Sequence, residues 1–177
     1  MLEDRVEFCS AIGGDVVAVH PPKDASNSGM SLKALESVRP FCEDRGIALA
    51  IENGFPADDE IRAQYFERFP PEFIGMCFDS GHANLNGNSE ELMKSASRLR
   101  ALHLHDNKGL PDDHQPPFYG TADWPRVLRW VDQTGYPEPV NFEMTHRPKY
   151  FEGGPEEYLD YAVKSIDTAM SRSGQVT

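Results

Sequence analysis

The chain has 177 residues, enough for one domain with a sizeable core but fewer than the roughly 250 of a complete eight-stranded β/α barrel. Its 17 basic and 29 acidic residues give a formal net charge of -12, which argues against nucleic acid as a partner. The three cysteines lack CxxC spacing, and the sequence shows neither a long apolar span nor a signal-peptide pattern. We therefore expect a cytoplasmic protein with reduced thiols and no membrane partner.

Five short apolar runs follow one another along the chain, and each ends in residues that bind divalent metals. Short apolar runs between turn formers are typical of buried parallel strands. The runs are DVVAVH ending at His20, IALAIE at Glu52, FIGMCFD at Asp79, ALHLHD from His103 to Asp106, and VNFE at Glu143. Each interval between these ends leaves room for a loop, a returning helix and the next strand. The pattern predicts a β/α barrel or an open α/β sheet with a metal centre at its carboxyl edge.

Helical patterns lie before and between these runs. They are LEDRVEFCSAIGG from Leu2, SLKALESVRPFCEDRG from Ser31 to Gly46, DDEIRAQYFERF from Asp58, SEELMKSASRL from Ser89, DWPRVLRWVDQTG from Asp123 to Gly135, and PEEYLDYAVKSIDTAMSR from Pro155. Pro40 predicts a kink or a late break in the second of them. The expected order is a strand followed by a helix, repeated five times.

The strand ends supply a set of metal ligands. Parallel strands bring their carboxyl ends to one edge of a sheet, so these side chains are expected to converge. Three carboxylates and one imidazole suit Mn²⁺, Mg²⁺, Co²⁺ or Zn²⁺. A helix N-cap or a solvated loop charge explains any one of them equally well, but buried carboxylates at successive strand ends need a cation or hydrogen bonds. The predicted ligands are Glu52, Asp79, His103 and Glu143.

Further polar residues follow the third and fourth runs. His82 comes three residues after Asp79, where one turn would bring it back toward the metal or over a substrate; a loop histidine without a role is the alternative. Within HLHD, strand alternation places His103 and His105 on one face. We expect His103 deeper, as the metal ligand, and His105 toward the pocket rim, in contact with substrate. Asp106 is expected to orient a ligand.

The motifs IEN, FDSGH, HLHD with the later DDH and GTADW, and the final FE resemble the xylose isomerase-like barrel superfamily. This superfamily includes sugar-phosphate isomerases and epimerases, inosose dehydratases and apurinic endonucleases of the endonuclease IV type. The resemblance covers nearly the whole chain and is more specific for the superfamily than for a substrate. In the sugar enzymes the corresponding residues bind one divalent ion, which implies the ligands Glu52, Asp79, His103 and Glu143 here.

The resemblance implies a metal-dependent sugar or sugar-phosphate isomerase or epimerase. Proton transfer next to a carbonyl would pass through a metal-stabilised enediolate, with Glu52 and Glu143 as base and acid. His82 contacts substrate in the epimerases, and His20 is a further candidate for the pocket wall. Where such enzymes often place an arginine, the nearest cation here is Lys108, which becomes a substrate-binding candidate. Hydride shift and polyol dehydration use much the same ligands.

An endonuclease IV-like zinc phosphodiesterase is the alternative function. That family uses three zinc ions, and Asp112 with His114 matches its D-x-H pair, so these two are candidate ligands for an additional metal. His20 matches a further zinc histidine. A polar loop before Pro116 explains the pair equally well. The isoelectric point of 4.8 and the lack of basic clusters in the sequence argue against this function.

The third interpretation is a non-catalytic, truncated barrel that still binds metal. The superfamily barrel has strands before the one that ends at His20, and five strands cannot close a barrel that needs about eight. We therefore expect one domain over residues 1–177, an incomplete TIM-type barrel of about five parallel strands with flanking helices. DVVAVH should be an edge strand, whose unpaired backbone groups favour a homo-oligomer. In-frame upstream coding sequence would distinguish a fragment from a whole protein.

Overall fold

The computed structural model describes residues 2–22, 25–54 and 57–173, and the chain divides into two compact units. Unit 1 comprises Met1–Phe78 and Ser97–Ala101, and unit 2 comprises Asp79–Ala96 and Leu102–Thr177. The strands are β1 (Val16–Val19), β2 (Ala48–Glu52), β3 (Ile74–Asp79) and β4 (Leu99–His103). The helices are α1 (Leu2–Ala11), η1 (Ala25–Asn27), α2 (Ser28–Arg45), α3 (Ala57–Arg68), α4 (Ser80–Asn86), α5 (Ser89–Met93), η2 (Ala96–Arg98), α6 (Trp124–Thr134) and α7 (Pro155–Ser173). Over the described residues, none of these helices is both long enough and apolar enough to span a bilayer.

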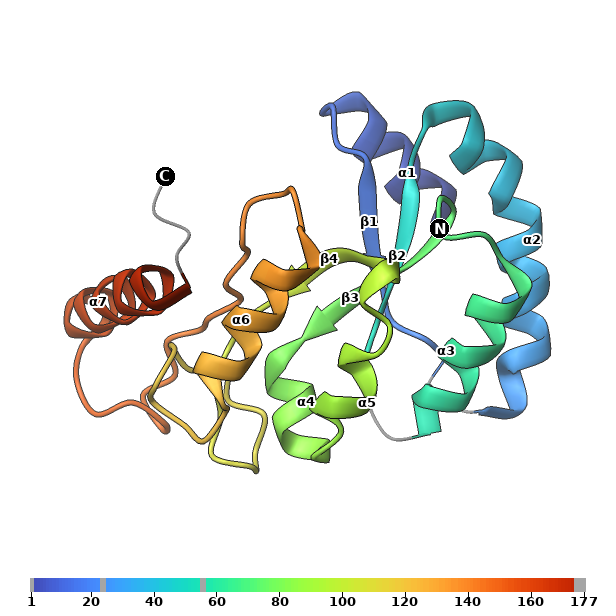
Figure 1. The fold of residues 1–177 in the computed structure, drawn as a ribbon. Coiled ribbons are helices and arrows are strands. Elements are labelled where there is room, and N and C mark those ends of the chain that lie inside the picture. The colour runs from blue at the N-terminus through green and yellow to red at the C-terminus, as the bar shows by residue number, and fades with distance from the viewer. Residues whose placement is uncertain (1, 23–24, 55–56, 174–177) are drawn as a thin grey trace. The chain divides into compact units, whose positions relative to one another are not determined.

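Four of the five apolar runs form a parallel sheet in the order β1-β2-β3-β4 (Figure 1). Val16 pairs with Ala48 on β2, and Leu49 pairs with Ile74 on β3. Every residue of β2 and β3 is buried, as near-continuous apolar composition predicts for inner parallel strands. The residues of β1 are only partly buried, and within the described part of the chain β1 pairs with β2 alone. The prediction of DVVAVH as an edge strand is confirmed.

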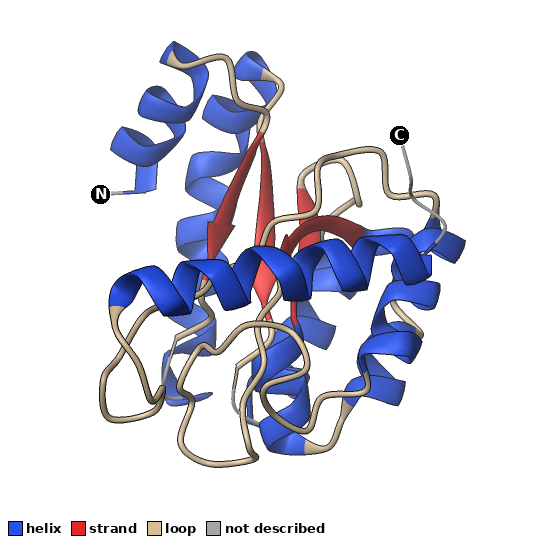
Figure 2. Ribbon diagram, turned by 90° about the vertical axis from the view of Figure 1, so that its left-hand side faces the viewer, coloured by secondary structure: helices blue, strands red, loops and turns tan. Residues whose placement is uncertain are grey.

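Helices α1, α2 and α3 of unit 1 contribute residues to one hydrophobic core with the strands. Figure 2 shows the strands running side by side with helices next to them. Val38 of α2 and Tyr65 of α3 are among the core residues. Of the two outcomes expected at Pro40, the late break does not occur, because α2 continues through Pro40 to Arg45, and the kink stays a prediction. Pro40 is exposed, so water can satisfy the carbonyl that its missing N–H leaves unpaired. Gly46 ends the helix as predicted, with φ of 64°.

Unit 2 begins with a helix that the sequence analysis did not predict. α4 follows directly on β3, and its N-cap is Asp79, whose Oδ1 accepts the backbone N–H of His82 at 2.7 Å. The helix expected from Ser89 to Leu99 is instead α5 followed by η2 and the first residue of β4. The later helices agree with prediction: Asp123 caps α6, and α7 begins at Pro155 and contacts α6.

The fifth predicted strand is reduced to a single bridge. Phe142 pairs in parallel with Leu104, through hydrogen bonds from Leu104 N–H to the Asn141 carbonyl (3.0 Å) and from Glu143 N–H to the Leu104 carbonyl (3.0 Å). Pro139 lies just before this segment and has no N–H to extend the ladder. The described residues therefore contain four strands rather than five, although the bridge still places Glu143 beside the end of β4.

Candidate metal centre

Three of the four predicted metal ligands come together in unit 2. Asp79 ends β3, His103 ends β4, and Glu143 follows the bridge to Leu104. One potential ligand atom of each lies within 4.8 Å of the others. His103 Nδ1 is 3.0 Å from Glu143 Oε2. The Asp79 side chain is buried, whereas those of His103 and Glu143 are 22% and 45% exposed, so the group has both a buried anchor and an open side.

The fourth predicted ligand, Glu52, belongs to unit 1. It is the last residue of β2 and is only 3% exposed. Its Oε1 lies 3.2 Å from Nε2 of His20, which follows β1 and has a side chain that is 71% exposed. A buried carboxylate needs such a partner to offset the loss of water. Metal ligation by Glu52 and a substrate contact by His20 stay predictions.

His82 lies in the first turn of α4, which brings its side chain back toward Asp79. Its Nδ1 is 3.6 Å from Asp79 Oδ2, and its Nε2 is 3.2 Å from Asp112 Oδ2. The His82 side chain is 20% exposed. It therefore links the predicted metal ligand Asp79 with the D-x-H pair, and it retains access to solvent.

A second group of potential ligands is formed by His105, Asp112 and His114, whose ligand atoms also lie within 4.8 Å of one another. Nε2 of His114 is 3.2 Å from Asp112 Oδ2. His114 has a φ of 49°, in the left-handed region that non-glycine residues adopt at a cost. The N–H of Thr145 donates to the His114 carbonyl at 3.0 Å and helps to hold this conformation. The predicted pair Asp112 and His114 is thus assembled with two further histidines.

The pKa values of Asp112 and His114 depend on each other. Burial raises the pKa of Asp112, but hydrogen bonds from His114 and His82 outweigh it and hold the pKa well below its usual range. The hydrogen bond to Asp112 raises the pKa of His114, and burial opposes that increase. Asp112 is therefore a carboxylate that stays ionised among imidazoles, an arrangement that attracts either protons or a cation.

The expected position of His105 at the pocket rim is wrong. The residue is 0% exposed, and its Nε2 lies 3.1 Å and 3.2 Å from the two carboxylate oxygens of Asp79. Strand alternation placed His105 on the same face as His103 but could not reveal that α4 covers it. A fully buried ring does not lie at a pocket rim, and a substrate contact by His105 stays a prediction.

Asp106 anchors a loop. Its Oδ1 accepts the N–H groups of Asn107 (2.8 Å) and Ala122 (3.1 Å), and its Oδ2 accepts Trp124 Nε1–H (2.8 Å). The backbones of Asp106 and Gln115 also exchange two hydrogen bonds, at 2.7 Å and 2.8 Å. These contacts fix both ends of the segment that carries the D-x-H pair. The expected role of Asp106 in orienting a ligand stays a prediction.

Lys108 lies on the same loop and is exposed. Its Nζ is 4.4 Å from the centroid of the Tyr119 ring, within the range of a cation–π contact. This contact gives the lysine a defined position, and a role in binding substrate stays a prediction.

Two residues that support the site escaped the sequence analysis. The Ser80 hydroxyl donates to the His105 carbonyl at 2.8 Å and accepts the His105 N–H at 2.9 Å. A Cβ on Gly81 would lie 1.9 Å from the His105 ring, so only glycine fits there. Both belong to the FDSGH motif. Two small residues between Asp79 and His82 were the feature of the sequence that could have indicated close packing there.

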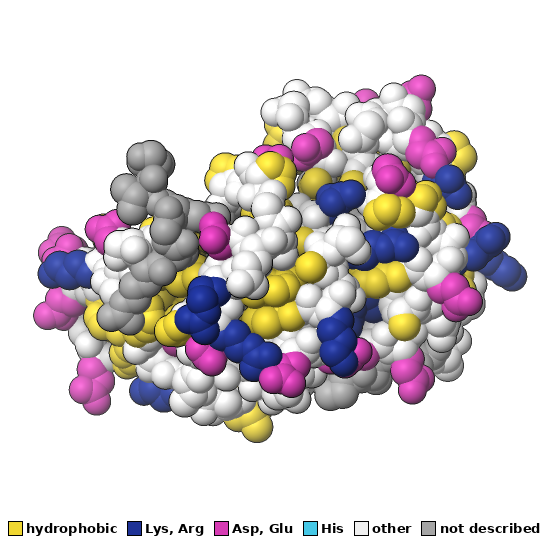
Figure 3. All heavy atoms as spheres, viewed as in Figure 1, with side chains coloured by type: hydrophobic (Ala, Val, Ile, Leu, Met, Phe, Trp, Pro, Cys, Tyr) yellow, Lys and Arg dark blue, Asp and Glu magenta, His cyan; other side chains and the backbone are white. Residues whose placement is uncertain are grey.

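One face of the surface carries charges of both signs. On the face drawn in Figure 3, Lys and Arg side chains are intermixed with Asp and Glu. Arg126, for example, is paired with Glu90 at 2.8 Å.

Comparison with known proteins yields a family match over most of the chain. A family model described as "Xylose isomerase-like TIM barrel" matches residues 1–169. The protein y4fM of Sinorhizobium fredii is 31% identical over 159 residues, covering 81% of this chain and 51% of that protein. An inosose isomerase of Bacillus velezensis is 23% identical and is matched over 80% of this chain and 55% of its own length.

The fold also matches solved structures. The crystal structure of a D-tagatose 3-epimerase-like protein aligns with a TM-score of 0.74 and 21% identity, covering 96% of this chain and 68% of that one. The chain spans about half the length of the two curated relatives described above.

Proposed function

This chain belongs to the xylose isomerase-like TIM barrel family. We propose that it acts as a metal-dependent isomerase or epimerase of small sugars, sugar phosphates or polyols. The observation that carries the proposal is the convergence of Asp79, His103 and Glu143 within 4.8 Å at the carboxyl ends of parallel strands. A relative named inosose isomerase supports the reaction class.

The donor set fits a divalent cation. Two carboxylates and one imidazole are a mixed oxygen and nitrogen set suited to Mn²⁺, Mg²⁺, Co²⁺ or Zn²⁺. We propose Glu52 as the fourth ligand, because it is a buried carboxylate at the end of a parallel strand. A bound ion would supply positive charge that polarises the oxygens of a hydroxycarbonyl substrate.

The chain's own groups would move the protons. Glu143 has a half-exposed carboxylate that a substrate can approach, and His103 Nδ1 at 3.0 Å can fix the orientation of that carboxylate. Glu52 is buried beside the exposed His20 ring, which offers a partner for a proton leaving the carboxylate. With one carboxylate accepting a proton and the other returning one, the pair suits interconversion next to a carbonyl. We further propose that His82, His20 and Lys108 contact the substrate.

The test is metal-dependent exchange of substrate hydrogen with solvent. The purified chain is incubated in D₂O with Mn²⁺ and a panel of ketoses and inososes, and NMR follows deuterium entering at the carbon next to the carbonyl. We expect exchange that a chelator abolishes and Mn²⁺ restores. Turnover without exchange would indicate hydride shift, and a panel with neither exchange nor turnover contradicts the proposal.

A second candidate function rests on the group of His105, Asp112 and His114. We propose Asp112 and His114 as ligands of an additional metal in a zinc phosphodiesterase of the endonuclease IV type. The ionised Asp112 carboxylate, 3.2 Å from each of two imidazoles, supports a second cation site. Cleavage of DNA with an abasic site in Zn²⁺ would favour this function over the sugar enzyme.

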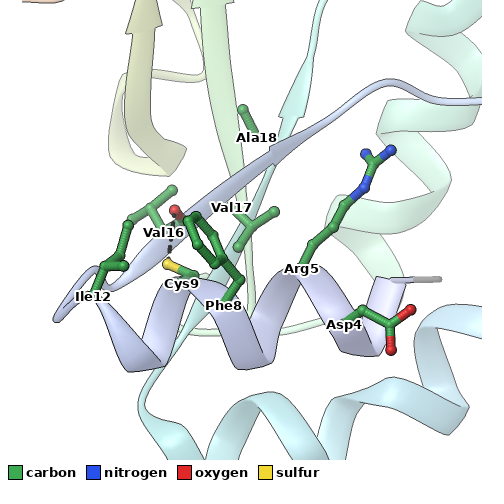
Figure 4. Close-up of a pocket in the computed structure, with 8 residues that line it drawn as sticks. All are labelled: Asp4, Arg5, Phe8, Cys9, Ile12, Val16, Val17 and Ala18. Carbon is green, nitrogen blue, oxygen red and sulfur yellow. Dashed lines mark hydrogen bonds between the residues drawn. The ribbon is translucent and has the colours of Figure 1, made fainter.

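We also propose that the chain associates with a second copy through the β1 edge. A groove of about 500 Å³ lies between α1 and β1, where Phe8, Cys9 and Ile12 face Val16 and Val17 (Figure 4). Phe8 and Ile12 are 66% and 67% exposed. A two-fold axis would place β1 antiparallel to its copy, so the same edge could supply both the backbone pairing and the apolar cover.

Replacing Phe8 and Ile12 together by serine is expected to convert a dimer into a monomer, because it removes the two most exposed apolar side chains of the groove. Light scattering after size exclusion measures the mass. Leu159→Ser, at a 60% exposed position on α7, is the matched control and should leave the dimer intact. A wild-type chain that is monomeric at micromolar concentration contradicts the proposal.

A further inference from the structure

His105 is the most enclosed imidazole of unit 2. Its side chain is 0% exposed, although the strand pattern predicts a position at the pocket rim. Burying a histidine among acidic groups takes the ring out of water, so the ring needs a hydrogen bond to compensate. The hydrogen bonds and packing of the ring therefore indicate the role of His105.

The ring faces the Asp79 carboxylate. His105 Nε2 lies 3.1 Å from one Asp79 oxygen and 3.2 Å from the other, which is donor distance to both. Within the described residues, Nδ1 has no hydrogen-bond partner. A neutral ring with its proton on Nε2 satisfies both observations, because it donates to Asp79 and leaves an unprotonated Nδ1 that needs no acceptor.

Three further contacts fix the ring in place. The Ser80 hydroxyl binds both the N–H and the carbonyl of His105, which locks its backbone. Gly81 allows the ring to approach closer than any Cβ would permit. On its other side the ring stacks on His114, with centroids 4.0 Å apart and planes at 12°. A side chain held by packing, by stacking and by a hydrogen bond at Nε2 is suited to orienting the group that it binds.

We propose that His105 is a positioning residue that orients the Asp79 carboxylate for metal binding through its Nε2–H. Asp79 is already committed at Oδ1 to the N–H of His82, and the histidine bond fixes the remaining freedom of the carboxylate plane. Through the stacked ring of His114, the same side chain joins the two groups of potential metal ligands. The inference rests on the proposed metal site and deepens it.

The test compares metal affinity in variants that keep or remove the donor. His105→Phe fills the volume without an N–H, whereas His105→Gln retains an N–H near the position of Nε2. We expect His105→Phe to weaken Mn²⁺ binding about 10- to 100-fold, the usual effect of losing a hydrogen bond to a ligating group, and His105→Gln to stay close to wild type. Titration calorimetry gives the affinity, and the visible spectrum of bound Co²⁺ reports the ligand geometry.

His146→Phe is the matched control, because it makes the same change in unit 2 at a ring whose Nε2 lies 3.3 Å from the Gly153 carbonyl oxygen. Circular dichroism confirms that each variant is folded; if His105→Phe is not, the more flexible His105→Met replaces it with the same expectation. Unchanged affinity in the variant without a donor, or equal weakening in the glutamine variant, overturns the inference. A wild-type chain that binds neither Mn²⁺ nor Co²⁺ instead contradicts the proposed metal site itself.

Discussion

Replacing Glu143 with glutamine is expected to abolish measurable Mn²⁺ binding. The change keeps the size of the side chain but removes a negative charge from the group formed with Asp79 and His103. It also leaves His103 Nδ1 beside an amide where it had a carboxylate at 3.0 Å. Hard divalent cations prefer charged oxygen ligands, so the loss of one from a small set has a large effect on affinity.

Titration calorimetry and the thermal stability of the chain both measure this effect. At a free Mn²⁺ concentration about 100 times its dissociation constant, binding stabilises the wild-type fold by about 2.7 kcal/mol, and this increment should be absent in Glu143→Gln. The control is Glu152→Gln, an exposed carboxylate on the same unit. Crystals soaked in Mn²⁺ would contradict the site if the ion had no Glu143 oxygen within about 2.6 Å.

The ends of the inner strands could be predicted because they depend on local composition. Runs such as IALAIE and FIGMCFD are apolar except for a single acidic residue at the carboxyl end. In a buried parallel strand, an acidic side chain is expected at the end of the strand and not among the apolar residues before it. Glu52 and Asp79 are the last residues of β2 and β3, as the sequence predicted. Helix caps at Gly46, Asp123 and Gly135 were equally local, and the structure confirms them.

The errors arose where tertiary contacts decide the outcome. Burial of His105 depends on Ser80 and Gly81, which lie 24 and more residues earlier in the sequence and cover the ring only once α4 has formed. VNFE forms only one bridge, and Pro139 just before it has no N–H to extend the pairing. The apolar pattern of so short a run does not include this effect. The positive φ of His114 likewise could not be predicted from the residue pattern.

The arrangement of unit 2 suggests why two metal chemistries are compatible with one sequence. Asp79 belongs to the first ligand group and is also bonded to His105, which belongs to the second. Asp112 meets His82 on one side and His114 on the other. Because Asp79 of the first group is hydrogen-bonded to His105 of the second, a cation bound in one group would change the electrostatic potential at the other. Metal stoichiometry is therefore as informative about function as metal identity.

The second large effect is expected for Glu52→Gln, which should lower turnover about 10²- to 10⁴-fold, the range typical of losing a general acid or base. Glu52 is 3% exposed and glutamine has nearly its shape, so the fold should survive while the proton-accepting oxygen is lost. NMR of substrate in D₂O should show deuterium exchange falling together with turnover. Glu60→Gln, an exposed carboxylate on α3, should retain both rates. If the Glu52 variant turns over substrate at the wild-type rate, the carboxylate is not needed for proton transfer, and a mechanism by hydride shift or a second base must replace the one proposed here.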